Sequence, residues 1–549
     1  MNKIFLSHLS ILAFAILISI PLIIPYLHPG FFQTHDGYWW VIRLADMFRE
    51  LKDLQFPPRY SEYLNSGYGY PLFNFTYPFP FYIGVLVKLL GFGFVDTIKI
   101  LFAASVPISA FFMFLASRNV WKNDFAGIIS SVLYLYFPYR LVDLFVRGSI
   151  GEALAFAIMP AVFLSLSKLV DNPKNYKYKL LGAFSYGVLI LTHNIIAVLF
   201  TISLFIFFLG NFIRKKYSIV KSFSFVIVFG FLISAYFWIP AILEKQFVQL
   251  SNVPIADRSI NFISINDLLF SPWGYDSTRG DSNPFTLQIG WPFLLIIIST
   301  LGLILYTYMK RKTKTDLYYL ALTLLIGTLI FSFLVFKQSN FIWQLPILSD
   351  VTFPWIVLSQ LGLLISLLAG YLAKFKITKY AAMGILFLVL FLYIPWAKPL
   401  RYEDKGDGFY YTNDDTTTTS KELMPLWVKK IPTERPASKV EIVEGNGRIE
   451  NVFYNSKTVS FDANLEMDTI ARINTIYYPG WKVSADGQNK EISYQNEKGV
   501  MEIRLPKGRS QVRAIFTETP QRMISNIISL SSIILVFVLV LKSFLRHKI

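Results

Sequence analysis

Cysteine is absent from the 549 residues, and charged residues are scarce. Without cysteine the chain can form no disulfide, no thiolate metal site and no cysteine nucleophile. Charged residues make up only 16% of the chain, whereas soluble domains carry about 25%. Hydrophobic residues reach 54% and aromatic residues 17%. This balance predicts a polytopic membrane protein.

The motifs of several enzyme classes are also missing. The sequence has no glycine-rich nucleotide loop, no His-Glu-x-x-His zinc motif and no Gly-x-Ser-x-Gly nucleophile elbow. These absences argue against a nucleotide-sugar donor, a zinc hydrolase and a serine hydrolase.

The net charge of +17 could suggest a nucleic-acid partner. However, the lysines and arginines stand in short tracts between apolar runs, which is the positive-inside pattern of membrane proteins. We therefore expect a lipid bilayer as partner and no nucleic acid.

Apolar runs long enough to cross a bilayer predict an α-helical bundle. The block 179–213 is too long for one span, breaks at Thr192-His193-Asn194 and is interpreted as two short spans, which gives about twelve in all. The ten single runs lie near 5–27, 97–117, 125–143, 150–169, 219–240, 291–309, 316–336, 352–373, 380–397 and 522–542.

With twelve spans, every basic tract falls on one side of the membrane together with both termini, and the positive-inside rule makes that side the cytoplasm. The short apolar segment 79–92 carries Lys88 and is interpreted as an interfacial or re-entrant helix. The basic tracts are Lys3, Arg118 with Lys122, 168–179, 214–216, 310–314, 374–379, and Arg546 with Lys548.

Three domains are predicted. Residues 1–397 form the bundle, with extracytoplasmic loops at about 28–96 and 241–290, and residues 521–549 form the last span and a cytoplasmic tail. Residues 398–520 form an extracytoplasmic β-rich domain, because alternating patterns appear after about 435 and Asp486-Gly487 is typical of a hairpin turn. We expect a small β-sandwich packed on the bundle.

This topology places the unusual ionisable residues on the outer side. Asp36 and His35 follow the first span, Arg140, Arg147 and Glu152 lie between the third and fourth, and His193 lies at the tip of the short-span hairpin. Such groups cost free energy at membrane depth unless they have partners. They therefore predict a polar cavity that opens toward the outer leaflet.

Several of these residues also have simpler interpretations. Arg147 and Glu152 could pair only with each other, His193 could bond a backbone group at a helix break, and Arg140 could extend to the interface. Asp36 has no basic neighbour in sequence to neutralise it, and this favours a functional role.

The charges of such a cavity suit sugar transfer from a phospholipid donor. A carboxylate can accept a proton from an attacking hydroxyl, while arginine and histidine stabilise a departing phosphate. Trp39 and Trp40 fit the headgroup level, and their rings suit the apolar faces of sugars.

At this point the sequence resembles a known family. An outer loop that opens with Thr34-His35-Asp36-Gly37 resembles the GT-C superfamily of membrane glycosyltransferases. Shorter segments are similar to the bacterial membrane proteins labelled 6-pyruvoyl-tetrahydropterin-synthase-related. These segments are Phe137-Pro138-Tyr139, Arg147-Gly148 with Glu152, Leu191-Thr192-His193-Asn194, Phe353-Pro354-Trp355, Leu423-Met424-Pro425-Leu426-Trp427, Tyr477-Tyr478-Pro479-Gly480-Trp481 and Glu518-Thr519-Pro520.

The resemblance implies a GT-C fold and transfer of a sugar from a polyprenyl-phosphate donor to a cell-envelope acceptor at the plasma membrane. Asp36 would be the catalytic base. The substrate-binding residues would be His35, Arg147, Glu152, His193, Arg140, Trp39 and Trp40.

Two features qualify this expectation. A basic residue often follows Phe-Pro-Trp in the family, but this chain has Ile356, so that phosphate contact would be absent or supplied elsewhere, for example by Arg140 or Lys337. Because Thr34-His35-Asp36-Gly37 has one acidic residue rather than an Asp-x-Asp pair, we expect no resident metal and no other cofactor, with a divalent cation as the open alternative.

Two other functions stay open. A transporter or flippase for a glycolipid would also use broken helices and polar groups at depth, but no internal repeat is evident. A non-catalytic envelope assembly protein would depend on residues 398–520 instead of Asp36.

Overall fold

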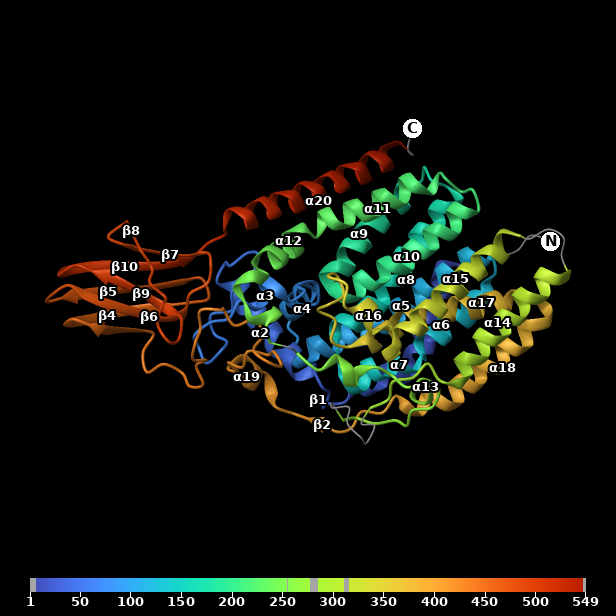
Figure 1. Ribbon diagram of the computed structural model, residues 1–549, viewed down its shortest axis with the longest axis horizontal. Helices are drawn as coiled ribbons and strands as arrows, with labels where there is room; N and C mark the ends of the chain where they lie inside the picture. The colour runs from blue at the N-terminus through green and yellow to red at the C-terminus, as the bar shows by residue number, and fades with distance from the viewer. Residues whose placement is uncertain (1–5, 254, 277–284, 311–314, 547–549) are drawn as a thin grey trace.

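The computed structural model describes residues 6–253, 255–276, 285–310 and 315–546. Lys3, residues 311–314 and Lys548, which entered the topology prediction, lie outside this part. Figure 1 shows a helical bundle with a β-domain at one end, and the N-terminus lies at the end of the bundle farthest from that domain.

Within the described residues, nine helical segments are long and apolar enough to cross a membrane. Six of them consist of one helix each and coincide with predicted runs. They are α5 (Phe94–Trp121), α8 (Ile150–Asp171), α10 (Asn194–Ile213), α14 (Trp291–Lys310), α15 (Asp316–Leu334) and α20 (Pro520–Arg546). The other three are α1 (His8–Ile23), α17 (Leu358–Lys374) and α18 (Lys376–Tyr393), each extended by an adjoining 3₁₀ turn.

Two more predicted spans are bent. α6 (Asp124–Leu135) meets α7 (Pro138–Val142) and the π turn after it at 46°, and α11 (Ile219–Ile233) meets α12 (Ala235–Glu244) at 67°. The first bend follows from Pro138, because proline disfavours helical backbone at the residue before it. Counting each bent pair as one span gives eleven among the described residues.

α9 (Tyr176–Thr192) coincides with the remaining predicted span. It has 17 residues and carries two lysines in its first turn, so it is shorter than the nine long apolar helices. It is separated from α10 at His193, whose extended backbone (φ −163°) interrupts the helix and whose Nδ1 accepts from the Ile196 amide at 3.3 Å. The predicted break at Thr192-His193-Asn194 is confirmed.

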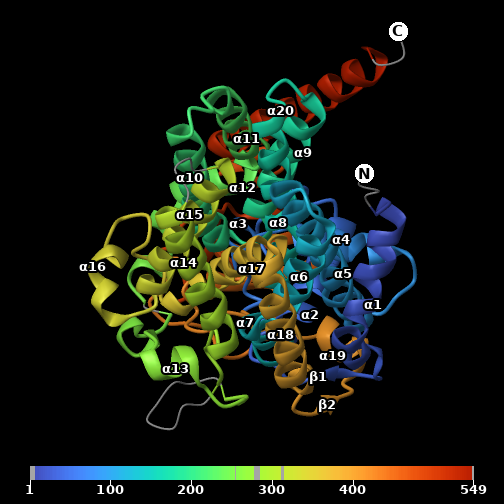
Figure 2. The same cartoon turned by 90° about the vertical axis from the view of Figure 1, so that its right-hand side faces the viewer.

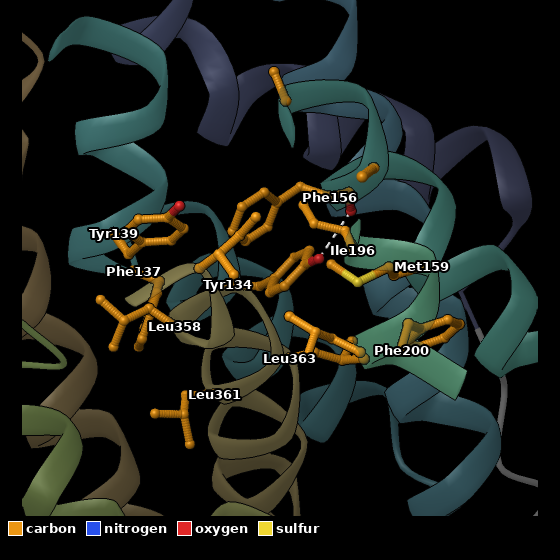
Figure 3. Packing of buried hydrophobic residues seen from close by; sticks show 14 of the residues in the cluster. Tyr134, Phe137, Tyr139, Phe156, Met159, Ile196, Phe200, Leu358, Leu361 and Leu363 are labelled. Atoms are coloured by element: carbon orange, nitrogen blue, oxygen red, sulfur yellow. Dashed lines mark hydrogen bonds between the residues drawn. The ribbon is translucent and has the colours of Figure 1, made fainter. Parts of the chain in front are cut away.

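The centre of the bundle is α17, which is buried along its whole length and lies amid the other helices in Figure 2. Figure 3 shows the packing around it. Leu358 of α17 lies near Phe137, Leu363 lies near Tyr134, and the Tyr134 hydroxyl donates to the Phe156 carbonyl at 2.9 Å. Tyr139 belongs to the same buried cluster.

Short elements cover the end of the bundle nearest the β-domain. The segment predicted to be interfacial forms α4 (Phe79–Leu89), with 11 residues. The other elements are β1 (Phe31–Phe32), α2 (Gly37–Lys52), α3 (Leu72–Phe75), α13 (Ile265–Leu269), α16 (Asn340–Trp343), β2 (Tyr402–Glu403) and α19 (Gly406–Tyr411).

The β-domain is a sandwich of two antiparallel sheets. One sheet has the order β4-β5-β10-β7-β8, the other has β3-β6-β9, and the inward side chains of both share one core. Asp486 and Gly487, both with positive φ, join β7 to β8 as predicted. The strands are β3 (Val440–Glu444), β4 (Gly447–Tyr454), β5 (Thr458–Leu465), β6 (Thr469–Ile476), β7 (Trp481–Ala485), β8 (Gln488–Lys490), β9 (Val500–Leu505) and β10 (Gly508–Phe516).

The sandwich spans fewer residues than the region 398–520 proposed for the β-rich domain, because its strands run only from β3 to β10. β2 pairs with β1 of the first loop rather than with the sandwich. The threonine linker also returns to the first loop, where Thr418 Oγ1 lies 2.9 Å from the Tyr70 hydroxyl. The first part of this region therefore lies on the bundle end, whereas Trp427, Lys429 and Lys430 bond to the sandwich.

A buried ion pair connects the sandwich to the bundle. Arg522 of α20 donates to both carboxylate oxygens of Glu244 in α12, at 2.7 and 2.6 Å. The Tyr478 hydroxyl and the Asn74 amide donate to the same carboxylate at 3.0 and 2.9 Å. Four segments distant in sequence thus meet at one carboxylate, which fixes the sandwich against α12 and α20.

Candidate active site

Asp36 lies where the first outer loop meets the turn between α7 and α8. The backbone amides of His35 and Asp36 donate to the carbonyls of Val146 and Arg147, at 3.0 and 2.9 Å. Gly148 has φ +63°, and a Cβ there would lie 2.3 Å from Thr34 Oγ1. Only glycine therefore permits this close approach, which explains the pairing of Arg147-Gly148 with Thr34-His35-Asp36.

Arg147 connects Asp36 to the core. Its Nη2 lies 3.9 Å from Asp36 Oδ2, and its Nη1 forms an ion pair with Glu152, a fully buried residue in the first turn of α8. Nη1 also donates to the Tyr139 hydroxyl at 3.0 Å, and this hydroxyl donates to Glu152 at 2.6 Å. The guanidinium is thus oriented by partners that are themselves immobile.

Trp355 supplies a further contact. The Arg147 guanidinium lies 4.5 Å from the centroid of its ring, a favourable cation–π distance. Ile356, the next residue, is buried and presents no charge. The Phe353-Pro354-Trp355 segment therefore places an aromatic face, rather than a cation, beside the site.

His35 is held on the other side of Asp36. Its Nε2 lies 3.0 Å from the Tyr275 carbonyl oxygen, and its ring meets Phe285 edge to face at 5.4 Å. Because a carbonyl only accepts, Nε2 carries the proton and Nδ1 has the lone pair in the neutral ring. Burial lowers the pKa of His35, which favours that neutral form.

The carboxyl of Asp36 has a raised pKa. Burial is the largest cause, while the positive charge of Arg147 opposes it. Arg147 is already paired with Glu152, whose negative charge further disfavours ionisation of Asp36. The side chain keeps 28% of its exposure, so a substrate can reach it. A carboxylate of this kind is more basic than a solvated one.

Arg43 is a site residue that sequence reasoning missed. It lies on α2, its Nε donates to Thr417 Oγ1 at 3.0 Å, and its guanidinium also donates to the Thr417 carbonyl. It lies 4.6 Å from the Trp40 ring centroid, and the charge of Asp36 influences its pKa. A spacing of seven residues, two helical turns, could have indicated that Arg43 shares a face with Asp36.

His193 reaches the same region through an aromatic neighbour. Its ring stacks on Tyr77 at 5.1 Å, and Tyr77 packs against Trp40 at 5.8 Å. A Cβ at Gly151 would lie 2.6 Å from the Tyr77 ring, so Tyr77 sits directly over the start of α8. His193 thus contacts Tyr77 and also caps α10.

Three residues lie away from the position proposed for them. Arg140 is buried in the helical core, where its Nη2 is 3.4 Å from the Ser105 carbonyl and its guanidinium lies over Phe156. Lys337 is exposed. Trp39 is half-buried next to Trp40. Because consecutive helical residues point about 100° apart, its side chain leaves the helix in a different direction from that of Trp40. Arg43, rather than Arg140 or Lys337, provides the second cation near Asp36.

A cavity of about 320 Å³ lies beside the residues that flank Asp36 in sequence, although Asp36 itself does not line it. Its wall includes Thr34, Tyr38 and Tyr410, together with Glu403 and Lys405. Rings and both signs of charge suit a polyhydroxylated ligand. Among the described residues, no group of three or more His, Asp or Glu side chains is arranged to hold a metal ion, and the expectation of a site without resident metal stays a prediction.

Comparison with known proteins gives one curated relative and several solved structures. A protein of Lactococcus lactis subsp. cremoris (strain MG1363), described as uncharacterized, is 24% identical over 346 residues, which cover 60% of this chain and 52% of that protein. The chain thus spans about half the length of this relative.

The solved structures show low similarity to this chain. The oligosaccharyltransferase of Archaeoglobus fulgidus matches in its apo form (TM-score 0.45, 14% identity, 77% of this chain and 61% of that chain). Its complex with an inhibitory peptide and a dolichol-phosphate matches with a TM-score of 0.46 and 15% identity, over 76% of this chain and 61% of that chain. ArnT from Cupriavidus metallidurans bound to undecaprenyl phosphate matches with a TM-score of 0.39 and 12% identity, over 70% of this chain and 62% of that chain. Similarity at this level does not establish an activity.

The family comparison matches residues 73–257, which contain Tyr77, Arg147, Glu152 and His193 of the site. The matching family is described as the 6-pyruvoyl-tetrahydropterin synthase related domain of membrane proteins. The resemblance indicated by the short motifs is confirmed for this segment, and the chain is a polytopic membrane protein in which residues 73–257 match the 6-pyruvoyl-tetrahydropterin-synthase-related domain.

Proposed function

We propose that this protein is a glycosyltransferase of the GT-C type, which moves a sugar from a polyprenyl-phosphate donor to an acceptor of the cell envelope. The reaction would take place on the extracytoplasmic side of the plasma membrane, with both termini in the cytoplasm. The basic tracts support this orientation, because the described ones lie at the bundle end away from the sandwich and Asp36.

The observation that carries the proposal is the arrangement around Asp36. A partly exposed carboxylate with a raised pKa lies 3.9 Å from Arg147 and beside a neutral histidine, at the bundle end where the first loop folds back. An ion pair with a purely structural role does not need an accessible carboxylate. A general base has to reach its substrate, and its pKa lies near the working pH.

The step we propose uses these groups directly. Asp36 accepts the proton of the acceptor hydroxyl as its oxygen attacks the anomeric carbon of the donor sugar. The bond between that carbon and the phosphate oxygen breaks, and polyprenyl phosphate leaves with the bonding electron pair. Arg43 and Arg147 stabilise the charge that develops on the phosphate. The products are the glycosylated acceptor and polyprenyl phosphate.

The activity can be tested in two complementary ways. The purified chain, reconstituted with a polyprenyl-phosphate-linked hexose or pentose and an envelope extract, should release polyprenyl phosphate. Mass spectrometry of envelope glycans with and without the gene should show a loss of one sugar mass. An unchanged glycan profile together with no release would overturn the proposal, and donor translocation without release would favour the flippase alternative.

Arg43→Gln should weaken donor binding by about 10- to 100-fold, because a hydrogen bond to a charged group contributes roughly 1.5–3 kcal/mol. The donor affinity of purified protein measures this effect. Arg43→Lys keeps the charge but not the fork geometry, so an intermediate affinity is expected. Unchanged donor affinity in Arg43→Gln would leave this arginine with a purely structural role in holding Thr417.

The rate of transfer should depend on pH through Asp36. The base acts only when it is deprotonated, so a raised pKa moves the acid limb of the rate profile to higher pH than an ordinary carboxyl would give. Transfer should therefore rise with pH through that pKa. An acid limb at or below the usual aspartate range would contradict the role given to burial.

A further inference from the structure

An apolar groove opens on the side of the bundle far from Asp36. It has a volume of about 700 Å³ and runs between α9, α11 and α20. Figure 1 shows α20 beside α11, and Figure 2 shows its C-terminal part reaching beyond the bundle. The apolar wall is formed mainly by Leu180, Leu181, Phe184, Ile233, Val536 and Phe537.

The mouth of the groove is polar and basic. Asn172, Lys174, Asn175 and Lys177 line it, in and just after the turn between α8 and α9. The turn is ordered by its own hydrogen bonds, from the Asn175 amide to the Asn172 carbonyl at 3.1 Å and from the Lys174 amide to Asn172 Oδ1 at 3.3 Å.

The charge at this mouth is not neutralised by the described part of the chain. Lys174 and Lys177 are exposed, and no described carboxylate oxygen lies within 4.0 Å of either ammonium group. The adjacent acid, Asp171, is paired with Lys122 at 2.5 Å. Two lysines therefore stand at the end of an apolar groove with their charge available to a ligand.

We infer that this groove binds one anionic phospholipid, with an acyl chain between α9 and α20 and the headgroup phosphate on Lys174 and Lys177. Apolar walls match the chain, and the uncompensated lysines match the phosphate. A second copy of this chain suits the mouth less well, because the protein carries a net charge of +17.

This lipid is distinct from the donor proposed above. The groove begins at the first turn of α9, whereas His193 lies beyond its last residue, roughly 25 Å away at 1.5 Å per residue. The inference therefore stands independently of the glycosyltransferase proposal. A lipid held between α9 and α20 would also add a contact to α20, whose outer face is largely exposed.

Native mass spectrometry of the full-length protein can test the inference. The probes are dioleoyl phosphatidylglycerol and dioleoyl phosphatidylcholine, which share acyl chains and differ in net charge. We expect one tightly retained phosphatidylglycerol per chain, with at least a 10-fold preference over phosphatidylcholine. Lys174→Ser combined with Lys177→Ser should abolish the preference, and Leu181→Trp should reduce retention of both lipids by filling the groove.

The matched control is Lys376→Ser, an exposed lysine at the start of α18 that lies outside the groove. It should bind lipid as the unmodified protein does. Equal retention of the two lipids by the unmodified protein would overturn the inference. So would a preference that survives the double lysine substitution, or a dimer that excludes lipid and is lost in Leu181→Trp.

Discussion

Asp36→Asn is expected to reduce sugar transfer by about 100-fold or more, the scale of a missing general base, while the protein still binds donor. Asparagine has nearly the shape of aspartate but cannot take up the acceptor proton at neutral pH. The backbone bonds of residue 36 to Arg147 do not involve the side chain, so the fold should persist. The measurement is single-turnover release of polyprenyl phosphate, with donor affinity determined in parallel.

The control for Asp36 is Asp96→Asn. Asp96 is an exposed acid near the start of α5 that pairs with Lys99 at 3.3 Å, so its neutralisation should leave transfer unchanged. Transfer by Asp36→Asn at the rate of the unmodified protein would remove the carboxylate from the reaction. It would favour an assembly protein, in which the sandwich carries the function.

Arg522→Met should destabilise the protein by about 3–5 kcal/mol, the usual cost of leaving a buried charge without its partner. Glu244 is 6% exposed in its side chain and would lose both bonds from the guanidinium. The melting temperature of the detergent-purified protein should fall, and limited proteolysis should show the sandwich released from the bundle.

The double variant Arg522→Met with Glu244→Gln distinguishes pairing from packing. Without the buried charge it should recover much of the loss, since replacing both partners of such a pair is often nearly neutral. Arg509→Met, at an exposed position of β10, serves as the control and should melt with the unmodified protein. Equal melting temperatures for Arg522→Met and Arg509→Met would contradict the importance of this ion pair.

Much of the fold was predictable, because its determinants are local. Spans such as α14 and α18 coincide with their apolar runs, and the turn at Asp486-Gly487 requires positive φ that glycine adopts without strain. The two short spans predicted for 179–213 form α9 and α10, which meet at His193.

The candidate site was predictable only in outline. His35, Asp36 and Arg147 do come together, because the topology places both loops at one end. Arg140 was misplaced, since its sequence position cannot show whether a side chain on a buried helix points to the core or to a cavity. The contact of Arg43 with Thr417 joins residues 374 positions apart, and no local pattern records such a pair.

The long-range contacts also determine when the bundle end can be completed. Arg43 and Glu244 are synthesised early, but their partners Thr417 and Arg522 leave the ribosome much later. Arg43 lacks this support until Thr417 has been synthesised, and Glu244 stays unneutralised until Arg522 has been synthesised. The bundle end therefore reaches its final arrangement only after almost the whole chain has been translated.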